Sequence, residues 1–368
     1  MHIRNLLPVA ALIAGACQNA SAPASVAEGE FLVIHGQGGQ SVSRFLPDQN
    51  LFRAEPASPY PATARAKSFR VTTGLHAGKV ITVGAASAET SLYDPVAGLF
   101  TTGPSLPVSF LPAGGTATFP RLNAANAGEQ VLVSTMPSLA IRYSPVSHDF
   151  QTEPAFLTFG YLNIIYQWDF SDSSNHYTYL VYEPGMASLF HHEANTTIFL
   201  PAPVFTLMGV HTGATITTGA YAGHSLVVSG GNPSLTFRMI PTGGSIVIAP
   251  GPNIGGTPLP GAGLCSFVIE SGTHSGKILV VHGASSTTTS LYDPIANQFI
   301  SGPPATGAVT VGAHANKITS GPHANKVLLI HGGNTTLTSI YDPVANTFAP
   351  GPVLPAPLGA GGHSVSLF

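Results

Sequence analysis

Charged side chains are scarce in this 368-residue chain. Lys and Arg number 13 and Asp and Glu 16, so 8% of residues are charged, where an average soluble domain has about 25%. So few cations exclude the basic footprint of a nucleic-acid-binding protein, and we expect no nucleic-acid partner. A hydrophobic fraction of 44% and a net charge of −3 also exclude a disordered chain.

Cysteine and tryptophan are nearly absent. The two cysteines are Cys17 and Cys265, and Trp168 is the single tryptophan. One tryptophan excludes a sialidase, whose repeated turns each carry one. Cys265 lies in a strand-like run without the ligand pattern of a galactose-oxidase-like copper site, so we expect a buried, inert thiol. No cofactor is predicted.

Long apolar runs are also missing, since none reaches the roughly 20 residues that span a bilayer. The run Leu6–Ala16 has 11 residues and follows Arg4, which suits the core of a signal peptide. Ala14-Gly15-Ala16-Cys17 resembles a bacterial lipobox, although family members prefer Leu where Ala14 stands. We predict a signal peptide over residues 1–16, a lipid anchor at Cys17 and a flexible tether over 17–29. Simple secretion and an uncleaved form remain alternatives.

Glycine and proline are abundant, with 41 and 32 copies. They disfavour helices, because Gly and Pro cost roughly 1 and 3 kcal/mol in a helix interior. An all-β chain with many turns is therefore expected.

An internal repeat organises the chain. A hydrophobic strand and glycines are followed by an aromatic residue, a proline two residues later, a phenylalanine and a Gly-Pro pair. The copies centre on Phe45 and Phe52, Tyr93 and Phe100, Tyr143 and Phe150, Tyr292 and Phe299, and Tyr341 and Phe348, with divergent copies at Phe190 and Phe199 and at Phe237 and Ile248. The proline that ends each unit recurs after 48, 50, 49, 49, 51 and 49 residues. This spacing predicts seven units of four short strands each.

The units resemble the kelch repeat, because Gly332-Gly333, Tyr341 and Phe348 keep its spacing with Phe in place of Trp. The resemblance covers residues 30–368 and implies a seven-bladed β-propeller of four-stranded antiparallel blades. It does not imply an activity, because propellers host both enzymes and scaffolds. Residues 31–56 lack a first strand, so we expect the C-terminal strand within 359–368 to close blade one. Asp94, Asp293 and Asp342 are expected to hold the turn between the last two strands of their units.

Histidine gives the first candidate site. His35, His282 and His331 share one repeat position in blades that adjoin once the ring closes, and three imidazoles could hold Zn or Cu. The alternative, which we favour, is three packed and hydrogen-bonded side chains left by duplication.

Blade four gives the second candidate, because residues 156–190 hold 10 of the 31 aromatic residues. Aromatic faces beside Asp, Asn and His suit a sugar or a protein contact, and bulkier packing between blades is the alternative. The residues proposed for binding are Trp168, Asp169, Asp172, His176, His191, His192 and Glu193.

These observations favour a monomeric, non-catalytic binding scaffold of the cell envelope or surface that presents its loops to a protein or glycan. Membrane contact is expected only through the anchor at Cys17. The alternative is an enzyme that acts on a carbohydrate or small molecule at the mouth of the propeller channel, with metal assistance from the histidines. No catalytic residue is assigned, and the choice between enzyme and scaffold stays open.

Overall fold

The computed structural model describes residues 26–368. Thirteen short gaps interrupt this range: residues 64–65, 85–86, 110–115, 122–125, 136–137, 154–163, 172–175, 183–185, 192–195, 201–210, 231–234, 243–244 and 256–258. Between residues 164 and 200 the strands are described but not their side chains. No helix among the described residues has the length and apolar character to cross a membrane.

The described strands form seven four-stranded antiparallel sheets. The innermost strands are β28 (His363–Ser366), β4 (Lys67–Arg70), β8 (Thr116–Pro120), β12 (Ile164–Ser171), β16 (His211–Thr215), β20 (Cys265–Val268) and β24 (His314–Lys317). The second strands are β1 (Phe31–Ile34), β5 (Val80–Val83), β9 (Gln130–Thr135), β13 (His176–Tyr182), β17 (Ser225–Ser229), β21 (Ile278–Val281) and β25 (Val327–Ile330). The third strands are β2 (Val42–Leu46), β6 (Thr90–Asp94), β10 (Ser138–Ser144), β14 (Met186–His191), β18 (Thr236–Thr242), β22 (Thr289–Asp293) and β26 (Thr338–Asp342). The outermost strands are β3 (Leu51–Ala54), β7 (Leu99–Thr102), β11 (Asp149–Glu153), β15 (Thr196–Leu200), β19 (Ser245–Pro250), β23 (Gln298–Ser301) and β27 (Thr347–Pro350).

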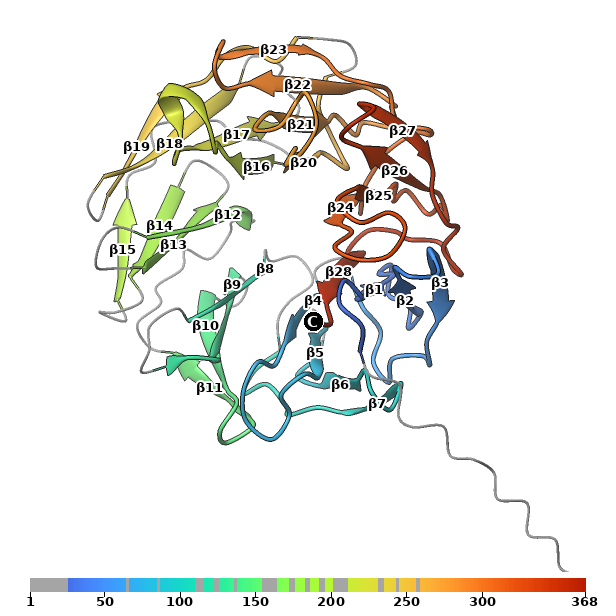
Figure 1. The fold of residues 1–368 in the computed structure, drawn as a ribbon. Coiled ribbons are helices and arrows are strands. Elements are labelled where there is room, and N and C mark those ends of the chain that lie inside the picture. Colours follow the sequence, from blue (N-terminus) through green and yellow to red (C-terminus); the bar gives the residue numbers. More distant parts are fainter. Residues whose placement is uncertain are drawn as a thin grey trace, which may run out of the picture.

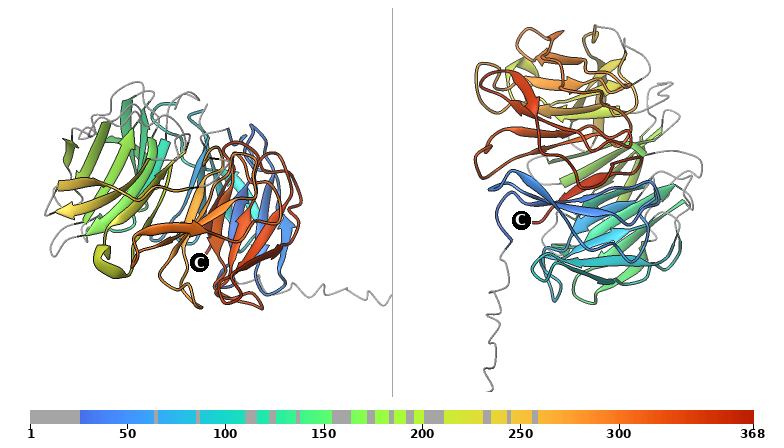
Figure 2. Two further views of the ribbon diagram at one scale, coloured as in Figure 1. Left: turned by 90° about the horizontal axis from the view of Figure 1, so that it is seen from above. Right: turned by 90° about the vertical axis from the view of Figure 1, so that its right-hand side faces the viewer.

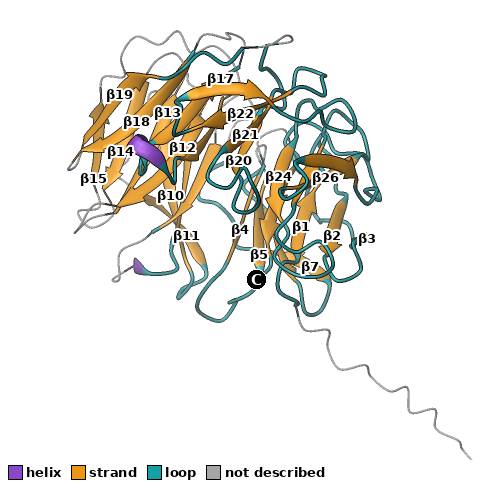
Figure 3. Ribbon diagram, turned by 45° about the horizontal axis from the view of Figure 1, so that its top comes forward, coloured by secondary structure: helices purple, strands orange, loops and turns teal. Residues whose placement is uncertain are grey.

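The sheets follow one another in a ring (Figure 1). Each innermost strand lies against the innermost strand of the next sheet, and β24 lies against β28, so the ring is closed. Seen from its edge, the strands run between the two faces of a disc (Figure 2). Helical residues are confined to short turns such as η2 (Gly219–Tyr221) (Figure 3). The predicted all-β propeller of four-stranded antiparallel blades is confirmed.

The C-terminal strand closes the ring as expected. β28 pairs with β1 antiparallel, with Phe31 opposite Ser366 and Ile34 opposite His363. The first sheet therefore joins the two ends of the described chain. An innermost edge that β1 would otherwise expose is covered by β28.

Burial follows the position of a strand in its sheet. Second strands such as β5, β21 and β25 are buried along their whole length. In the five regular repeats the aromatic residue of the third strand packs on the phenylalanine of the fourth, as Tyr292 does on Phe299 with ring centroids 5.3 Å apart. Innermost strands such as β24 and β28 are only half-buried. Polar side chains on these strands are therefore accessible candidates for function.

The Asp-Pro turns are built as predicted. Asp293 Oδ1 accepts hydrogen bonds from the backbone N–H groups of Ile295 and Ala296, at 2.9 and 3.1 Å. Asp94 and Asp342 do the same. Each of the three aspartates also pairs with a lysine, which the sequence analysis missed: Lys79 with Asp94, Lys277 with Asp293 and Lys326 with Asp342.

Three of the periodic prolines, each just after a fourth strand, accept a hydrogen bond from the start of the third strand in the same sheet. Thr289 Oγ1 on β22 donates to the Pro303 carbonyl at 2.7 Å, and Thr90 and Thr338 make the same bond to Pro104 and Pro352. Gly103, Gly302 and Gly351 precede these three prolines, and each is needed because the threonine occupies the space of a side chain. A Cβ on Gly302 would stand 2.3 Å from Thr289 Oγ1.

The two divergent repeats differ from the regular ones in the register of their third and fourth strands. Phe199 lies opposite Ser188 rather than Phe190, and Ile248 lies opposite Met239 rather than Phe237. The expected aromatic partners are therefore not cross-strand neighbours in these two sheets, because the spacing between them exceeds the seven residues of the regular turn.

Candidate functional site

Polar side chains bridge neighbouring innermost strands around the ring. Ser364 Oγ on β28 donates to Asn316 Oδ1 on β24 at 2.6 Å. Thr212 Oγ1 on β16 lies 2.9 Å from Ser266 Oγ on β20. A third bridge, from β28 to β4, differs in kind because it joins a serine to a histidine.

That bridge is the contact between Ser68 and His363. Ser68 Oγ lies 2.9 Å from His363 Nε2, and His363 Nδ1 lies 2.8 Å from the Gly361 carbonyl. A carbonyl only accepts hydrogen bonds, so Nδ1 carries the proton of the neutral ring. Nε2 is therefore the free acceptor and takes the Ser68 hydroxyl proton. A nucleophile, a base and a group that orients the base lie in series.

Thr82 completes this arrangement from the second strand. Thr82 Oγ1 lies 2.8 Å from Ser68 Oγ. Because Ser68 gives its only proton to His363, the Thr82 hydroxyl donates to Ser68. The Ser68 side chain is thus fixed in the rotamer that points at the imidazole.

The electrostatic surroundings keep His363 neutral. The pKa of His363 is lowered to about 3, chiefly by burial and also by the charges of Lys67 and the neighbouring His314, against the opposing effect of the Gly361 hydrogen bond. The pKa of His314 is lowered by burial and by His35. Both imidazoles are therefore unprotonated at neutral pH.

His314 repeats half of the arrangement in the neighbouring sheet. Its Nδ1 lies 2.9 Å from the Gly312 carbonyl, which fixes the same tautomer. Its Nε2 has no hydrogen-bond partner among the described residues, and neither has Asn316 Nδ2 two residues along β24. An acceptor and a donor are thus unmatched beside the Ser68–His363 pair.

Ser68 and His363 are not among the site residues predicted from the sequence. His363 was read only as part of the closing strand, and Ser68 lies in no recognised motif. The sequence feature that could have pointed to His363 is the glycine-rich segment before β24 and β28, since His314 and His363 are the first residues of these two strands. Nothing local indicated that β4 would supply the serine.

The structure does not bring the three predicted metal ligands together. His35, His282 and His331 are buried, and the Nε2 of each bonds a serine of the third strand in its own sheet. These bonds are to Ser43 at 2.6 Å, Ser290 at 2.8 Å and Ser339 at 2.5 Å. In the part of the chain that is described, no three His, Cys, Asp or Glu side chains are placed to share a metal ion. The metal hypothesis is therefore replaced by packed histidines, each satisfied by its own sheet.

The blade-four residues lie in the sheet of β12–β15. Trp168 and Asp169 are on β12, where Trp168 is opposite Tyr179, and His176 begins β13 opposite Ser171. His191 ends β14 opposite Tyr177. Asp172, His192 and Glu193 lie outside the described residues, as does Cys17. The binding and lipidation hypotheses therefore stay predictions.

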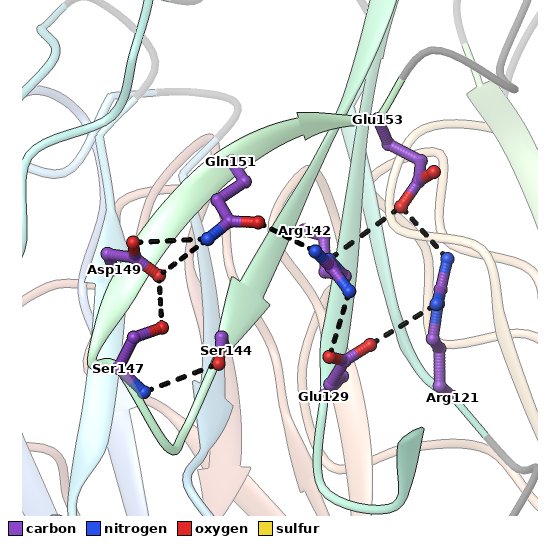
Figure 4. Close-up of polar contacts among 8 residues, drawn as sticks. All are labelled: Arg121, Glu129, Arg142, Ser144, Ser147, Asp149, Gln151 and Glu153. Carbon is purple, nitrogen blue, oxygen red and sulfur yellow. Dashed lines mark hydrogen bonds and ion pairs between the residues drawn. The ribbon is translucent and has the colours of Figure 1, made fainter. Parts of the chain in front are cut away.

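A cluster of ion pairs occupies the sheet of β8–β11 (Figure 4). Arg121 pairs with Glu129 at 3.2 Å and Glu153 at 2.9 Å, and Arg142 pairs with the same two glutamates at 3.1 and 3.8 Å. The four charges alternate in a closed circuit, and each is neutralised by two neighbours. This arrangement suits a structural clamp between strands rather than a charged substrate site.

Two cavities lie near Lys317 at the far end of β24. One of about 230 Å³ is mainly apolar and includes Phe267 and Tyr341 in its lining. The other, of about 320 Å³, includes Asn316 and Phe368. Lys317 is paired with Glu270. Neither lining contains the Ser68–His363 pair.

Cys265 agrees with its prediction. The thiol is free and buried, and burial raises its pKa to about 12. A thiol this hard to ionise is inert at neutral pH.

Comparison with solved structures shows the fold. The periplasmic gluconolactonase of Pseudomonas aeruginosa is 10% identical and superposes with a TM-score of 0.58 over 92% of this chain and 99% of its own. A putative 6-phosphogluconolactonase of Bacteroides fragilis is 8% identical, with a TM-score of 0.57 over 93% and 100%. A fungal alcohol oxidase of the AA5 family, in complex with copper, is 14% identical, with a TM-score of 0.52 over 92% and 68%. Identities this low establish the propeller fold alone.

Sequence comparison shows no family. No family model matches the chain, and no curated protein matches it. Kelch membership therefore stays a prediction.

Proposed function

We propose that this chain is an exported hydrolase of a cyclic ester of sugar type, a lactone, with Ser68 and His363 as its reacting pair. The observation that carries the proposal is the tautomer of His363. Because Nδ1–H is held by the Gly361 carbonyl, Nε2 is placed to take the Ser68 proton. Two of the similar solved structures are named as lactonases, which favours this ester class.

The chemistry proceeds in two balanced steps. Ser68 Oγ attacks the lactone carbonyl carbon while its proton passes to His363 Nε2. The ring C–O bond breaks, and the departing oxygen takes that proton, which leaves a ring-opened acyl group on Ser68. Water then attacks the acyl carbon and gives a proton to Nε2, and the Ser68 Oγ–acyl bond breaks as Oγ regains it. The net change is lactone plus water to hydroxy acid.

Nearby residues have defined roles in this scheme. Lys67 precedes Ser68 on β4, and its positive charge favours the oxyanion that forms in each step. The negative charge of the oxyanion raises the basicity of His363 as the intermediate forms. This effect offsets the low pKa of His363 in the free protein.

A matched pair of variants tests the proposal. Ser68→Ala is expected to lower hydrolysis of glucono-δ-lactone by at least about 10³-fold, because the nucleophile is lost. Ser266→Ala is the control: it occupies the second position of β20, as Ser68 does on β4, and removes the bridge to Thr212. Each variant loses one hydrogen bond between sheets, of about 1 kcal/mol. Equal activity in the two variants would show that the Ser68–His363 contact is only a structural hydrogen bond between two sheets.

A covalent probe separates a serine nucleophile from a water activated directly by histidine. A serine-directed phosphonate is expected to label Ser68, as mapped by mass spectrometry, and His363→Gln is expected to abolish the labelling. Labelling elsewhere, or none in an active enzyme, contradicts the acyl-serine step.

A second function, binding of a glycan or protein, is favoured by the hairpin of β12 and β13. These strands have 8 and 7 residues, whereas β24 and β25 have 4 each. The longer hairpin carries Trp168, Asp169 and His176. A glycan array and a pull-down with wild type and Trp168→Ala test it, and equal binding by both proteins removes it.

The export proposal concerns Cys17. We propose that Cys17 is lipidated after cleavage before it and that the protein is held in the bacterial envelope. Radiolabelled palmitate is expected in the wild type and absent from Cys17→Ser. Incorporation that persists in the variant contradicts the anchor.

A further inference from the structure

The most exposed aliphatic side chains lie on one face of the disc. They are found in the turns between first and second strands and between third and fourth strands, and both kinds of turn lie on the same face of an antiparallel sheet. The residues, with their exposed fractions, are Leu75 (87%), Val96 (47%), Val146 (91%), Ile295 (82%) and Val344 (71%). We call this set the aliphatic face.

Contacts between sheets confirm that these turns adjoin. A Cβ on Gly74, beside Leu75, would stand 2.3 Å from the Pro145 carbonyl, beside Val146. The same approach joins Gly272 to Pro343 at 2.3 Å and Gly219 to Pro294 at 2.7 Å. The opposite face also carries exposed aliphatic side chains, at Val353 (65%), Leu337 (47%) and Val311 (42%), but the four most exposed ones, Val146, Leu75, Ile295 and Val344, all lie on the aliphatic face.

The N-terminal segment joins the propeller on this face. Ser320 Oγ donates to the Glu28 carbonyl, and a Cβ on Gly321 would stand 2.3 Å from the Pro47 carbonyl in the last turn of the first sheet. The chain before Glu28 contains Cys17, which is its first residue after the proposed cleavage. Whatever holds that segment to a membrane therefore holds this face toward it.

Three turns on the face carry paired charges. The lysine–aspartate pairs of the Asp-Pro turns lie beside Val96, Ile295 and Val344, with N–O distances of 3.1, 2.8 and 2.8 Å. Paired charges reduce the cost of bringing these turns to a lipid headgroup layer.

We propose that the aliphatic face docks on a phospholipid bilayer, into which Val146, Ile295, Val344 and Leu75 insert. Each side chain contributes little, so the face acts as a second membrane signal beside the N-terminal segment. The proposal rests on the proposed envelope location and not on lactone hydrolysis. It places the propeller disc parallel to the membrane, with the Ser68–His363 end of the innermost strands facing away.

A depth probe tests the docked orientation. In full-length Cys17→Ser protein, an NBD fluorophore is attached at Ile295→Cys, and the buried Cys265 does not compete because its thiol is not ionised. Thr287→Cys is the control, since Thr287 is exposed in the β21–β22 turn on the opposite face of the same sheet. With vesicles of phosphatidylethanolamine and phosphatidylglycerol, the probe at 295 is expected to shift to shorter wavelength and be quenched by brominated lipid, while the probe at 287 stays unchanged.

Binding affinity gives a second readout. Val146→Ser, Ile295→Ser and Val344→Ser together are expected to weaken vesicle partition about 30-fold, roughly threefold for each side chain. Leu337→Ser, a similar change on the opposite face of the β24–β27 sheet, is expected to leave it unchanged. Equal accessibility of the two probes on bound vesicles, an unaltered partition of the triple variant, or binding of a protein in place of lipid would overturn the proposal. None of these outcomes bears on the proposed lactone hydrolysis, which is measured separately in solution.

Discussion

Tyr341 and Asn346 form a hydrogen bond across the turn between β26 and β27. Tyr341 Oη donates to Asn346 Oδ1 at 2.9 Å, and Asn346 carries the turn through a φ of 52°. Tyr292 and Asn297 repeat this relationship at 3.0 Å with a φ of 51°. One asparagine therefore supplies both the left-handed backbone and the partner of a buried tyrosine.

Gly98 holds the same position in the β6–β7 turn, where φ is 64°, and the Tyr93 hydroxyl has no hydrogen-bond partner among the described residues. A Cβ at Gly98 would meet nothing closer than Glu55 Oε2 at 3.7 Å. Gly98→Asn is therefore expected to raise the free energy of unfolding by about 1–2 kcal/mol, from the new bond and reduced unfolded-state entropy. Chemical denaturation measures the change. Gly98→Ala, which has no bonding group, is expected to destabilise by about 1 kcal/mol, and a stabilised alanine variant contradicts the argument.

The ion-pair circuit of Arg121, Glu129, Arg142 and Glu153 is expected to be sensitive to loss of one member. Arg121 is 2% exposed and Glu153 8%, so Arg121→Leu leaves the buried Glu153 carboxylate with only the 3.8 Å contact to Arg142 within the circuit. The free energy of unfolding is expected to fall by about 3–5 kcal/mol. Lys317→Ala, which removes the exposed pair with Glu270, is expected to cost less than about 1 kcal/mol. Similar losses in the two variants, measured by urea unfolding, would exclude a buried circuit.

Acid is expected to destabilise the fold through histidines before it acts on aspartates. Burial lowers the pKa of His363 to about 3 and of His331 to about 4, and also lowers that of His35 and His314. The unfolded chain binds protons near pH 6.5 and the native protein does not, so stability is complete above pH 6.5 and falls as the pH drops toward 4. For each pH unit below about 6.5, each of these histidines lowers the free energy of unfolding by up to about 1.4 kcal/mol.

The aspartates act in a lower range. Asp293 and Asp342 have a lowered pKa because of Lys277 and Lys326, and the stability they contribute is present above about pH 4 and lost below it. Melting temperatures recorded between pH 3 and 8 separate the two ranges. A melting temperature constant from pH 7 to 4.5 would contradict the buried neutral histidines.

Deletion of residues 359–368 is expected to prevent folding. β1 loses its partner β28, and the buried Leu367 is removed from the cluster that contains Leu32 and Ile34. The truncated chain should lack a cooperative thermal transition by circular dichroism. Deletion of Phe368 alone, which is 63% exposed, is the control and should melt like the wild type. A truncated protein with an unchanged melting temperature refutes ring closure by β28.

The sequence by itself determined the repeat architecture. The Tyr-to-Phe spacing sets the register of the last two strands, and the Asp-Pro dipeptide sets the turn between them, because both depend on hydrogen bonds within a few residues. The closing strand was predictable for a related reason, since the first unit lacks one strand and the chain ends with one. Burial of Cys265 followed from its strand-like surroundings. The register of the sheets at Phe190 and Phe237 was not predictable, because their turns depart from the common length.

Only the tertiary structure decided which side chains meet across the ring. Ser68 and His363 are 295 residues apart and become neighbours because β28 returns beside β4. The shared repeat position of His35, His282 and His331 suggested a common site, yet each imidazole is held by a serine within its own sheet. A repeat specifies the bonds inside each sheet, whereas contacts between sheets depend on how the sheets twist and close. The low charge could be read from the composition alone, whereas the neutral Ser68–His363 pair exists only where two innermost strands meet.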